Sequence, residues 1–436
     1  MQIPVINTLK SPLIFLVVIY LAGCVPVTNT GSNTSQSEEL VTFEDKIYEP
    51  DIKTVRLYVN KGYKGAINEP AVNNIRQLQQ FVLEFDELSE QAEYYQARIL
   101  HCDRNWNKSL LQSIEYLDTY NEYDITDYDF SANTRIPYTH YTFLVPRVNI
   151  PGNYLLVIYK RDNPGDLVLT RRFMTFDTQV EIRPSFTLSS GINERRTHQQ
   201  VDFKLDYSGL DILNPHEEVS IVIRQNKRWD NTISNLKASF IREIQKELDY
   251  SYFNLENNFH GGNEFRFFDL RSIRAPGQNV GKVDISNDRV DAYIMVDKDR
   301  SYQYYGHRED LNGGYYIENF DTGDDILESQ YVNVHFFLES EEEYATDVYV
   351  FGELSNWSIN PDNRLTFDPE LKGYRGDLLL KQGWYDYIFH TPQNPYLVEG
   401  SHFETENVYE IFVYYRFTGG KADLLVGYKI INFGGR

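Results

Sequence analysis

From residue 43 onward, the chain is a series of short segments in which apolar and polar residues alternate. Residues 53–59, KTVRLYV, are typical, because every second side chain is apolar. A period of two predicts a β-strand with one face on a core, and the glycine, proline, asparagine and aspartate residues between segments predict turns. The segments that we expect to be strands are 53–59, 80–85, 94–100, 141–145, 154–159, 167–176, 199–205, 219–225, 264–270, 289–296, 331–338, 347–352, 373–380, 384–389, 409–415 and 424–428.

Two segments depart from this pattern. Residues 106–123 fit a helical face loosely through Leu110, Leu111, Ile114 and Leu117. Residues 239–250 fit either a short helix or a strand, since a short apolar run does not distinguish the two.

The strands fall into three groups, which agrees with the length of 436 residues at roughly 150 residues per domain. Boundaries are expected near Arg183-Pro184 and at the acidic, glycine-bearing segment 321–325. We therefore predict an all-β protein of tandem antiparallel immunoglobulin- or fibronectin-like β-sandwiches. The predicted domains are a first sandwich at 43–183, a middle β domain at 184–328, and a C-terminal sandwich at 329–436.

The N-terminal segment has the pattern of an export signal. Lys10 precedes the apolar run 13–20 and the small residues of Leu21-Ala22-Gly23-Cys24, as in a secretory signal peptide. The run is shorter than the ~20 residues of a membrane-spanning helix, which disfavours a stop-transfer anchor. The sequence ending in Cys24 resembles a bacterial lipobox. This resemblance implies that residues 1–23 are removed and that Cys24 is acylated.

The segment after Cys24 is polar and aperiodic. Residues 24–42 are rich in serine, threonine and asparagine and are expected to form a flexible tether. No acidic run stands directly beside Cys24. By analogy with lipoprotein sorting, this favours the periplasmic face of the outer membrane.

The charge and the cysteines narrow the function further. The net charge is −22, which excludes nucleic-acid binding through phosphate neutralisation and leaves membrane attachment to the acyl chains. Cys102 is the only other cysteine, so no intramolecular disulfide is expected beside an acylated Cys24. Cys102 is either a nucleophile or an inert packing residue, and packing is the favoured interpretation because a buried cysteine is usually inert.

The sequence contains no catalytic motif. Its nine histidines form no His-x-His or His-Glu-x-x-His pair, and a serine elbow, a phosphate loop and a dinucleotide fingerprint are absent. We predict that the protein is not an enzyme and uses no cofactor, and we keep a carboxylate-dependent hydrolase as a weaker alternative. Two acidic groups remain open between calcium binding and ordinary loop chemistry: Asp124, Asp127 and Asp129, and Asp321, Asp324 and Asp325.

Residues 350–357, VFGELSNW, and 380–389, LKQGWYDYIF, form a more specific pair of segments. They resemble the early-set immunoglobulin-like modules of glycogen-active enzymes, with Asn356 and Trp357 at the turn and Gly383, Tyr385, Tyr387 and Phe389 in the strand. In some of those modules the tryptophan stacks on sugar. The resemblance implies an early-set-like C-terminal module and, as an alternative function, a glycan-binding envelope lipoprotein. The competing interpretation, which we favour, is that the Trp357 side chain packs over the end of the sandwich core.

A second resemblance spans about residues 43–430. It rests on nine segments taken together: 43–48, 99–106, 131–134, 138–141, 151–154, 225–230, 261–266, 380–383 and 399–403. As a set they resemble the type IX secretion system plug protein family, formerly a domain of unknown function.

This resemblance implies a non-enzymatic envelope protein that docks on the periplasmic mouth of the type IX outer-membrane translocon β-barrel and closes it when no cargo shuttle is present. Together with the lipobox, it implies a protein held at the outer membrane through Cys24, facing the periplasm and monomeric in itself. The lipobox also leaves open a paralogue with another docking partner. Because tryptophan is enriched at binding hot spots, the candidate contacts with a partner or glycan are Trp106, Trp229, Asn356 and Trp357.

Overall fold

The structure is a computed structural model that describes residues 41–434. The predicted signal peptide 1–23, Cys24 and nearly all of the tether 24–42 lie outside the described residues. The predicted all-β sandwich fold is confirmed, and each segment expected to be a strand overlaps one. The immunoglobulin-like and early-set-like details remain predictions.

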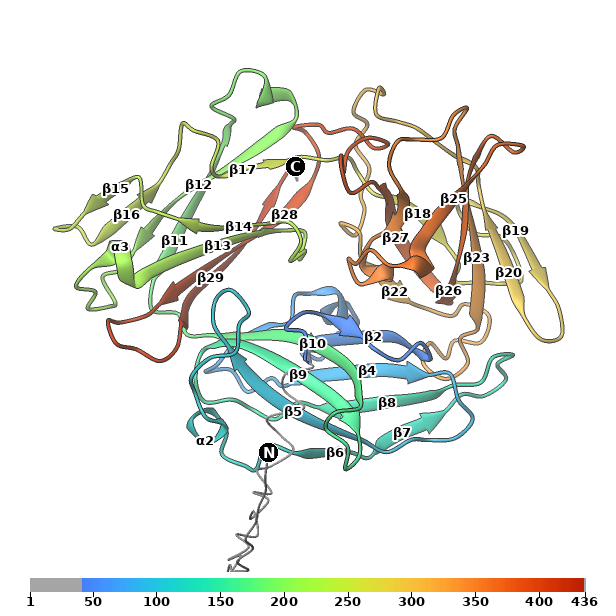
Figure 1. Cartoon of the computed structure of the whole chain (residues 1–436), viewed down its shortest axis with the longest axis horizontal. Coiled ribbons are helices and arrows are strands. Elements are labelled where there is room, and N and C mark those ends of the chain that lie inside the picture. The colour runs from blue at the N-terminus through green and yellow to red at the C-terminus, as the bar shows by residue number, and fades with distance from the viewer. Residues whose placement is uncertain (1–40, 435–436) are drawn as a thin grey trace, which may run out of the picture.

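The first sandwich, drawn at the bottom of Figure 1, consists of two sheets. Its six-stranded sheet contains, in spatial order, β1 (Lys46–Ile47), β10 (Leu167–Phe176), β9 (Gly152–Lys160), β5 (Tyr95–Cys102) and β6 (Tyr123–Ile125), with β3 (Val72–Asn74) parallel to β10. Its four-stranded sheet contains β2 (Ile52–Val59), β4 (Phe81–Glu87), β8 (Thr139–Leu144) and β7 (Asp127–Phe130).

The middle sandwich is assembled from two distant parts of the chain. One sheet contains β11 (Glu181–Leu188), β12 (His198–Asp206), β16 (Glu247–Tyr250) and β15 (Phe240–Arg242), with β17 (Asn258–His260) beside β12. The other contains β14 (Thr232–Leu236), β13 (Val219–Gln225), β28 (Asn407–Tyr415) and β29 (Leu424–Phe433).

The third domain is inserted between β17 and β28 and forms a ten-stranded sheet. Its strands are, in spatial order, β18 (Arg266–Asp269), β27 (Gly383–His390), β24 (Val348–Phe351), β25 (Arg364–Asp368), β26 (Gly373–Lys381), β23 (Tyr331–Glu339), β20 (Val290–Ile294) and β19 (Val280–Ile285), with β22 (Tyr315–Ile317) beside β27 and β21 (Asp297–Lys298) beside β23. The sheet curls around one core, since Phe268 of β18 lies 5.7 Å from Phe336 of β23 between ring centroids.

This topology corrects the predicted boundary between residues 328 and 329. Strand β13 pairs with β28 from Val219↔Tyr415 to Gln225↔Tyr409, and β20 pairs with β23. The predicted boundary therefore divides the middle sandwich and also the inserted third domain. The physical reason is that alternation along a strand does not specify which other strand it pairs with. The first boundary, at 183, falls within β11.

Helices are short throughout the described residues. They are α2 (Ser113–Tyr116), α3 (Pro215–Glu218), and the 3₁₀ turns η1 (Lys64–Asn68), η2 (Glu194–Arg196), η3 (Glu353–Ser355) and η4 (Pro361–Asn363). The helix expected over 106–123 is wrong except at α2, and two residues of its expected apolar face, Leu110 and Ile114, are exposed to solvent. Residues 239–250, which the sequence left open, form the β15–β16 hairpin.

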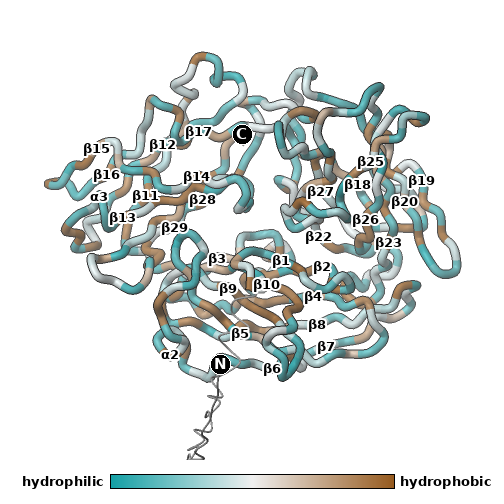
Figure 2. The backbone as a smooth tube through the Cα atoms, in the orientation of Figure 1, coloured by the Kyte–Doolittle hydropathy of each residue, from teal (hydrophilic) through white to brown (hydrophobic). Residues whose placement is uncertain are grey.

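The sheet that contains β9 is buried on both faces. On one side, Leu156 and Phe173 pack in the core of the first sandwich. On the other, Val157 joins Phe412 and Leu425 of the middle sandwich in a second core. Two-sided burial explains why residues 154–159 contain only apolar and aromatic side chains, and it accounts for the brown centre of this sheet in Figure 2.

Candidate interaction site between the domains

Two of the predicted contact residues join the first and middle sandwiches to each other. Trp106 follows β5, and Trp229 follows the turn after β13. Their rings are nearly perpendicular, with centroids 4.9 Å apart. The guanidinium of Arg172 lies 4.7 Å from the Trp106 ring, and that of Arg224 lies 4.3 Å from the Trp229 ring. These tryptophans are therefore engaged inside the chain. The turn begins at Asn226, whose φ of 51° fits the turn role expected for it.

The other two predicted residues lie where all three domains meet. Asn356 and Trp357 follow η3 with φ of 53° and 52°. Arg171 of the first sandwich donates from Nη2 to Asn356 Oδ1 at 2.7 Å. The guanidinium of Arg228, from the middle sandwich, lies 4.9 Å from the Trp357 ring.

The surroundings of Trp357 favour core closure over sugar binding. Its ring contacts Phe265 and Phe351 edge to face, with centroids 6.0 and 5.5 Å apart, and Arg228 lies over it. Gly313 approaches so closely that a Cβ there would lie 2.2 Å from the ring. A sugar-stacking platform needs an open ring face, so the glycan alternative is not supported.

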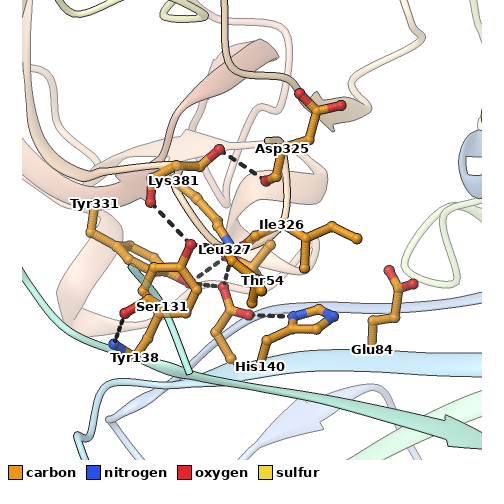
Figure 3. Close-up of polar contacts among 12 residues, drawn as sticks. Thr54, Glu84, Ser131, Tyr138, His140, Asp325, Ile326, Leu327, Tyr331 and Lys381 are labelled. Carbon is orange, nitrogen blue, oxygen red and sulfur yellow. Dashed lines mark hydrogen bonds and ion pairs between the residues drawn. The ribbon is translucent and has the colours of Figure 1, made fainter. Parts of the chain in front are cut away.

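A buried polar network joins the first sandwich to the inserted domain (Figure 3). Asp86 of β4 accepts from Lys381 Nζ at 2.7 Å, and its other oxygen lies 2.7 Å from His140 Nδ1. The Tyr331 hydroxyl donates to Asp86 at 2.7 Å and lies 2.7 Å from Thr54 Oγ1. The side chains of Lys381 and Asp86 are only 2% and 1% exposed.

Asp86 and Lys381 each stabilise the charged form of the other. Burial by itself would raise the pKa of Asp86, but Lys381 and His140 outweigh it and lower the pKa. Burial lowers the pKa of Lys381, although Asp86 opposes this shift. Lys381 also donates to the Ile326 carbonyl at 2.8 Å, and the Tyr138 hydroxyl donates to the same oxygen at 2.7 Å. The fully paired network fixes the orientation of the two domains.

Sequence reasoning did not single out this network. Asp86 directly follows the predicted strand 80–85, and Lys381 follows the predicted strand 373–380. A charged residue at the end of an apolar run is usually solvated, so neither had a local signal. The available hints were the segments 138–141 and 380–383 within the family resemblance, which contain His140 and Lys381.

A cavity of about 930 Å³ lies beside this network, between the first sandwich and the inserted domain. We call it the interdomain pocket. It is lined by residues 44–50 and 52–55 of the first sandwich and by 353–360, 362–363 and 377–381 of the inserted domain, with Tyr315 and Tyr385. Asn356 and Trp357 belong to the junction of the three domains, and Lys381 belongs to the buried polar network. All three residues line the pocket, so the pocket lies against both of these contacts.

A separate acidic cluster lies near the junction of the inserted domain. Burial, reinforced by Asp310, raises the pKa of Asp386 to about 7. Burial raises the pKa of Glu264 to about 7 against the opposing hydrogen bond from Tyr305, 2.5 Å long. Asp310 accepts from the backbone N–H of Phe265 at 2.6 Å. Burial therefore holds the pKa of two carboxyl groups in this cluster, those of Asp386 and Glu264, well above the ordinary value.

Asp386→Asn tests this cluster. A carboxyl with a raised folded-state pKa stabilises the fold below its unfolded pKa, and this stability is lost as the pH rises through about 7. The free energy of unfolding should therefore fall by up to about 1.4 kcal/mol per pH unit between the unfolded pKa of about 3.9 and the folded pKa of about 7. We expect Asp386→Asn to flatten the pH dependence measured by urea denaturation between pH 4 and 7. Asp162→Asn, at a side chain 87% exposed, is the control. Equal pH dependence in both variants would contradict the assignment.

The remaining candidates have ordinary surroundings. Cys102 is fully buried, and burial raises the pKa of its thiol to about 12, which favours the packing interpretation over the nucleophile interpretation. In the second acidic group, Asp321 accepts from Ser272 Oγ at 2.6 Å and Asp324 accepts from the Ile326 N–H at 3.0 Å, as in loop chemistry. In the first, Asp124 accepts from Gln96 at 2.9 Å.

Among the described residues, no group of three or more His, Cys, Asp or Glu is placed to hold a metal ion. Within residues 41–434, none of the helices has the length and apolar character needed to cross a membrane.

Comparison with known proteins agrees with the family resemblance. Residues 52–177 match the family described as type 9 secretion system plug protein 1st domain, which confirms the resemblance through the first sandwich. A crystal structure described as a hypothetical protein from Parabacteroides merdae ATCC 43184 is similar over 90% of this chain and 100% of that chain, with 28% sequence identity and a TM-score of 0.84. No curated protein matches this chain. The match over the first sandwich thus points to a secretion-related, non-catalytic role in the cell envelope.

Proposed function

We propose that this chain, which carries the first domain of the type 9 secretion plug family, docks on the periplasmic mouth of the type IX outer-membrane translocon β-barrel and seals or regulates it. The family match over residues 52–177 is the observation that carries the proposal. The protein acts as a monomeric, non-enzymatic subunit without a cofactor.

The interfaces between the domains support this role. A plug must keep its shape while it covers an opening wide enough for folded cargo. The Asp86–Lys381 pair joins the first sandwich to the inserted domain, and the Trp106–Trp229 pair joins it to the middle sandwich. The hydrophobic core shared by the first and middle sandwiches opposes relative domain motion, because such motion is expected unless an interface is large and hydrophobic.

Acylation of Cys24 would hold the plug at the outer membrane, facing the periplasm. The segment 25–40 averages about 20–25 Å from end to end as a flexible coil. A tether of this length raises the local concentration of the folded domains near a translocon embedded in the same membrane. The lipid then contributes to occupancy without contributing to the docking surface.

Co-purification tests the proposal. Affinity-tagged protein, extracted in gentle detergent at native expression, should recover a very large β-barrel. Cys24→Ala should reduce that recovery at least tenfold, in line with the gain expected from tethering, without changing the thermal unfolding midpoint. Ser32→Ala, which changes the tether and keeps the lipobox, is the matched control. Consistent elution of the tagged wild type alone would refute docking, and unchanged recovery of Cys24→Ala would limit the lipid to targeting.

A further inference from the structure

We propose that the interdomain pocket receives an extended, lysine- or arginine-rich segment of a partner protein, which adds a strand to the free edge of β26. The inference deepens the proposed function, and it rests on that function only for the identity of the partner as a translocon component. Strand addition itself is a property of this chain and is testable with a peptide.

The wall of the pocket formed by β26 is an incompletely paired strand. On one side, β26 pairs with β23 over its whole length, from Tyr331↔Lys381 to Glu339↔Gly373. On the other side, β25 pairs only with Gly373, Tyr374 and Arg375. Residues 377–381 lie beyond this pairing and line the pocket. An unpaired strand edge is a template for another extended chain.

The register between β26 and β23 identifies which backbone N–H and C=O groups of β26 point away from β23, on the side of the pocket. The Gln382 N–H donates to the Gln330 carbonyl at 2.9 Å, so Leu380 and Leu378 direct their N–H and C=O groups toward β23. Because hydrogen-bonded positions alternate along an antiparallel strand, Leu379 directs its N–H and C=O groups to the opposite edge. These are the groups that an added strand would pair with.

The opposite wall is a second sheet edge. Strand β2 is at the end of its sheet, and residues 52–55 line the pocket. The ladder between β2 and β4 shifts register between Lys53 and Arg56. Within this shift, Thr54 has a φ of 51°, a conformation that β-branched residues rarely adopt. Strain of this kind is concentrated at functional sites, and here the Tyr331 hydroxyl, 2.7 Å from Thr54 Oγ1, helps to hold it.

The charge of the pocket lining indicates whether the bound segment is basic or acidic. Six carboxylates line the pocket, and three lysines stand against them. Glu49 and Glu353 pair with Lys160 and Lys227 outside the lining, and Lys381 pairs with Asp86, which leaves four carboxylates against two lysines. The carboxylates are Glu44, Asp45, Glu49, Glu353, Asp362 and Asp377, and the lysines are Lys46, Lys53 and Lys381. A basic segment is therefore attracted and an acidic one repelled.

The same charge argument disfavours the two occupants that this chain offers. Residues 25–40 contain Glu38 and Glu39 and no lysine or arginine. A second copy of the chain carries the same net charge of −22, so it would be repelled. A partner with basic residues remains the favoured occupant.

Peptide binding to the acylated full chain in detergent tests the inference. The probe is fluorescent acetyl-Lys-Val-Lys-Val-Lys-Val-Lys-amide, and the readouts are fluorescence anisotropy and hydrogen exchange of the Leu379 amide. We expect saturable binding and at least tenfold slower exchange at Leu379. A peptide with glutamate in place of lysine, and one with N-methylated valines, should bind at least tenfold more weakly.

Two variants locate the binding site. Leu379→Pro removes an N–H that does not bond to β23, which an edge strand tolerates, and should abolish binding. Asp362→Lys, at an exposed lining residue, should weaken binding of the lysine peptide at least fivefold. Glu370→Lys, an exposed residue of the same domain outside the lining, is its matched control.

Several outcomes would overturn the inference. These are equal binding of the lysine and glutamate peptides, no change in Leu379 exchange, or unchanged binding by Asp362→Lys. If Leu379 is already protected without peptide and deletion of residues 25–40 removes that protection, the tether is the occupant and the inference is wrong. Failure of the wild type to recover a β-barrel would refute the proposed function alone, because peptide binding does not depend on it.

Discussion

Lys381→Met should lower the free energy of unfolding by about 3–5 kcal/mol, which is the cost of leaving one member of a buried ion pair uncompensated. Asp86 would keep His140 and Tyr331 as partners but lose its only ammonium partner among the described residues. Because the pair joins two domains, the loss should appear as an early transition in urea denaturation, in which the inserted domain separates from the first sandwich.

The control for this experiment is Lys372→Met. Lys372 pairs with Glu341 at the surface, where the two side chains are 61% and 75% exposed, and an exposed pair contributes only about 0–1 kcal/mol. Asp86→Asn combined with Lys381→Met should recover part of the loss, since no charge is then left unpaired. Equal effects of Lys381→Met and Lys372→Met would show that the buried pair does not stabilise the interface.

The pH dependence gives the pair an independent signature. The pKa of Asp86 is lowered in the folded protein, so its stabilising effect is present above the unfolded pKa of about 3.9. That effect is lost as the pH falls through the lower folded value. The difference between wild type and Lys381→Met should therefore be largest near neutral pH and should narrow in strongly acidic solution.

Trp106→Ala should destabilise the contact between the first and middle sandwiches by about 3–5 kcal/mol, the usual cost of truncating a buried tryptophan. The side chain fills a core shared by both sandwiches, and it contacts Trp229 and the Arg172 guanidinium. The φ of 65° at this position disfavours alanine and tryptophan alike, so lost packing dominates the difference. Urea denaturation measures the stability, and small-angle X-ray scattering should show a larger radius of gyration.

Two variants control for the size and the position of the deleted ring. Trp106→Phe keeps an aromatic ring against Trp229 and should have a smaller effect than Trp106→Ala. Tyr120→Ala removes an aromatic side chain that is 78% exposed and should change stability by no more than about 0.5 kcal/mol. An unchanged radius of gyration together with unchanged stability in Trp106→Ala would contradict the role of this contact.

The sequence predicted the strands well because the signal for a strand is local. Alternation along 53–59 and 373–380 follows from one buried and one exposed face, and both segments overlap strands, β2 and β26. The uninterrupted apolar segment 154–159 contains a further signal. A strand without polar positions needs cover on both faces, and β9 is buried on both.

The sequence did not predict which residues would meet. Asp86 and Lys381 are separated by 295 positions, and Arg171 and Asn356 by 185. Trp106 and Trp229 were candidates for contact with a partner, but they contact each other. Periodicity places a side chain on a face of a strand and contains no information about the strand or domain that covers that face.

By itself, the sequence determined the all-β class, the positions of the strands, the absence of local catalytic motifs and the resemblance to the plug family. Each of these depends on neighbouring residues or on short segments of the chain. Only the tertiary structure decided that the third domain is inserted into the second, that the charged network is buried, and that residues of β2 and β26 line one pocket. These features depend on strand pairing between distant parts of the chain, where burial and the balance of charge determine which contacts are stable.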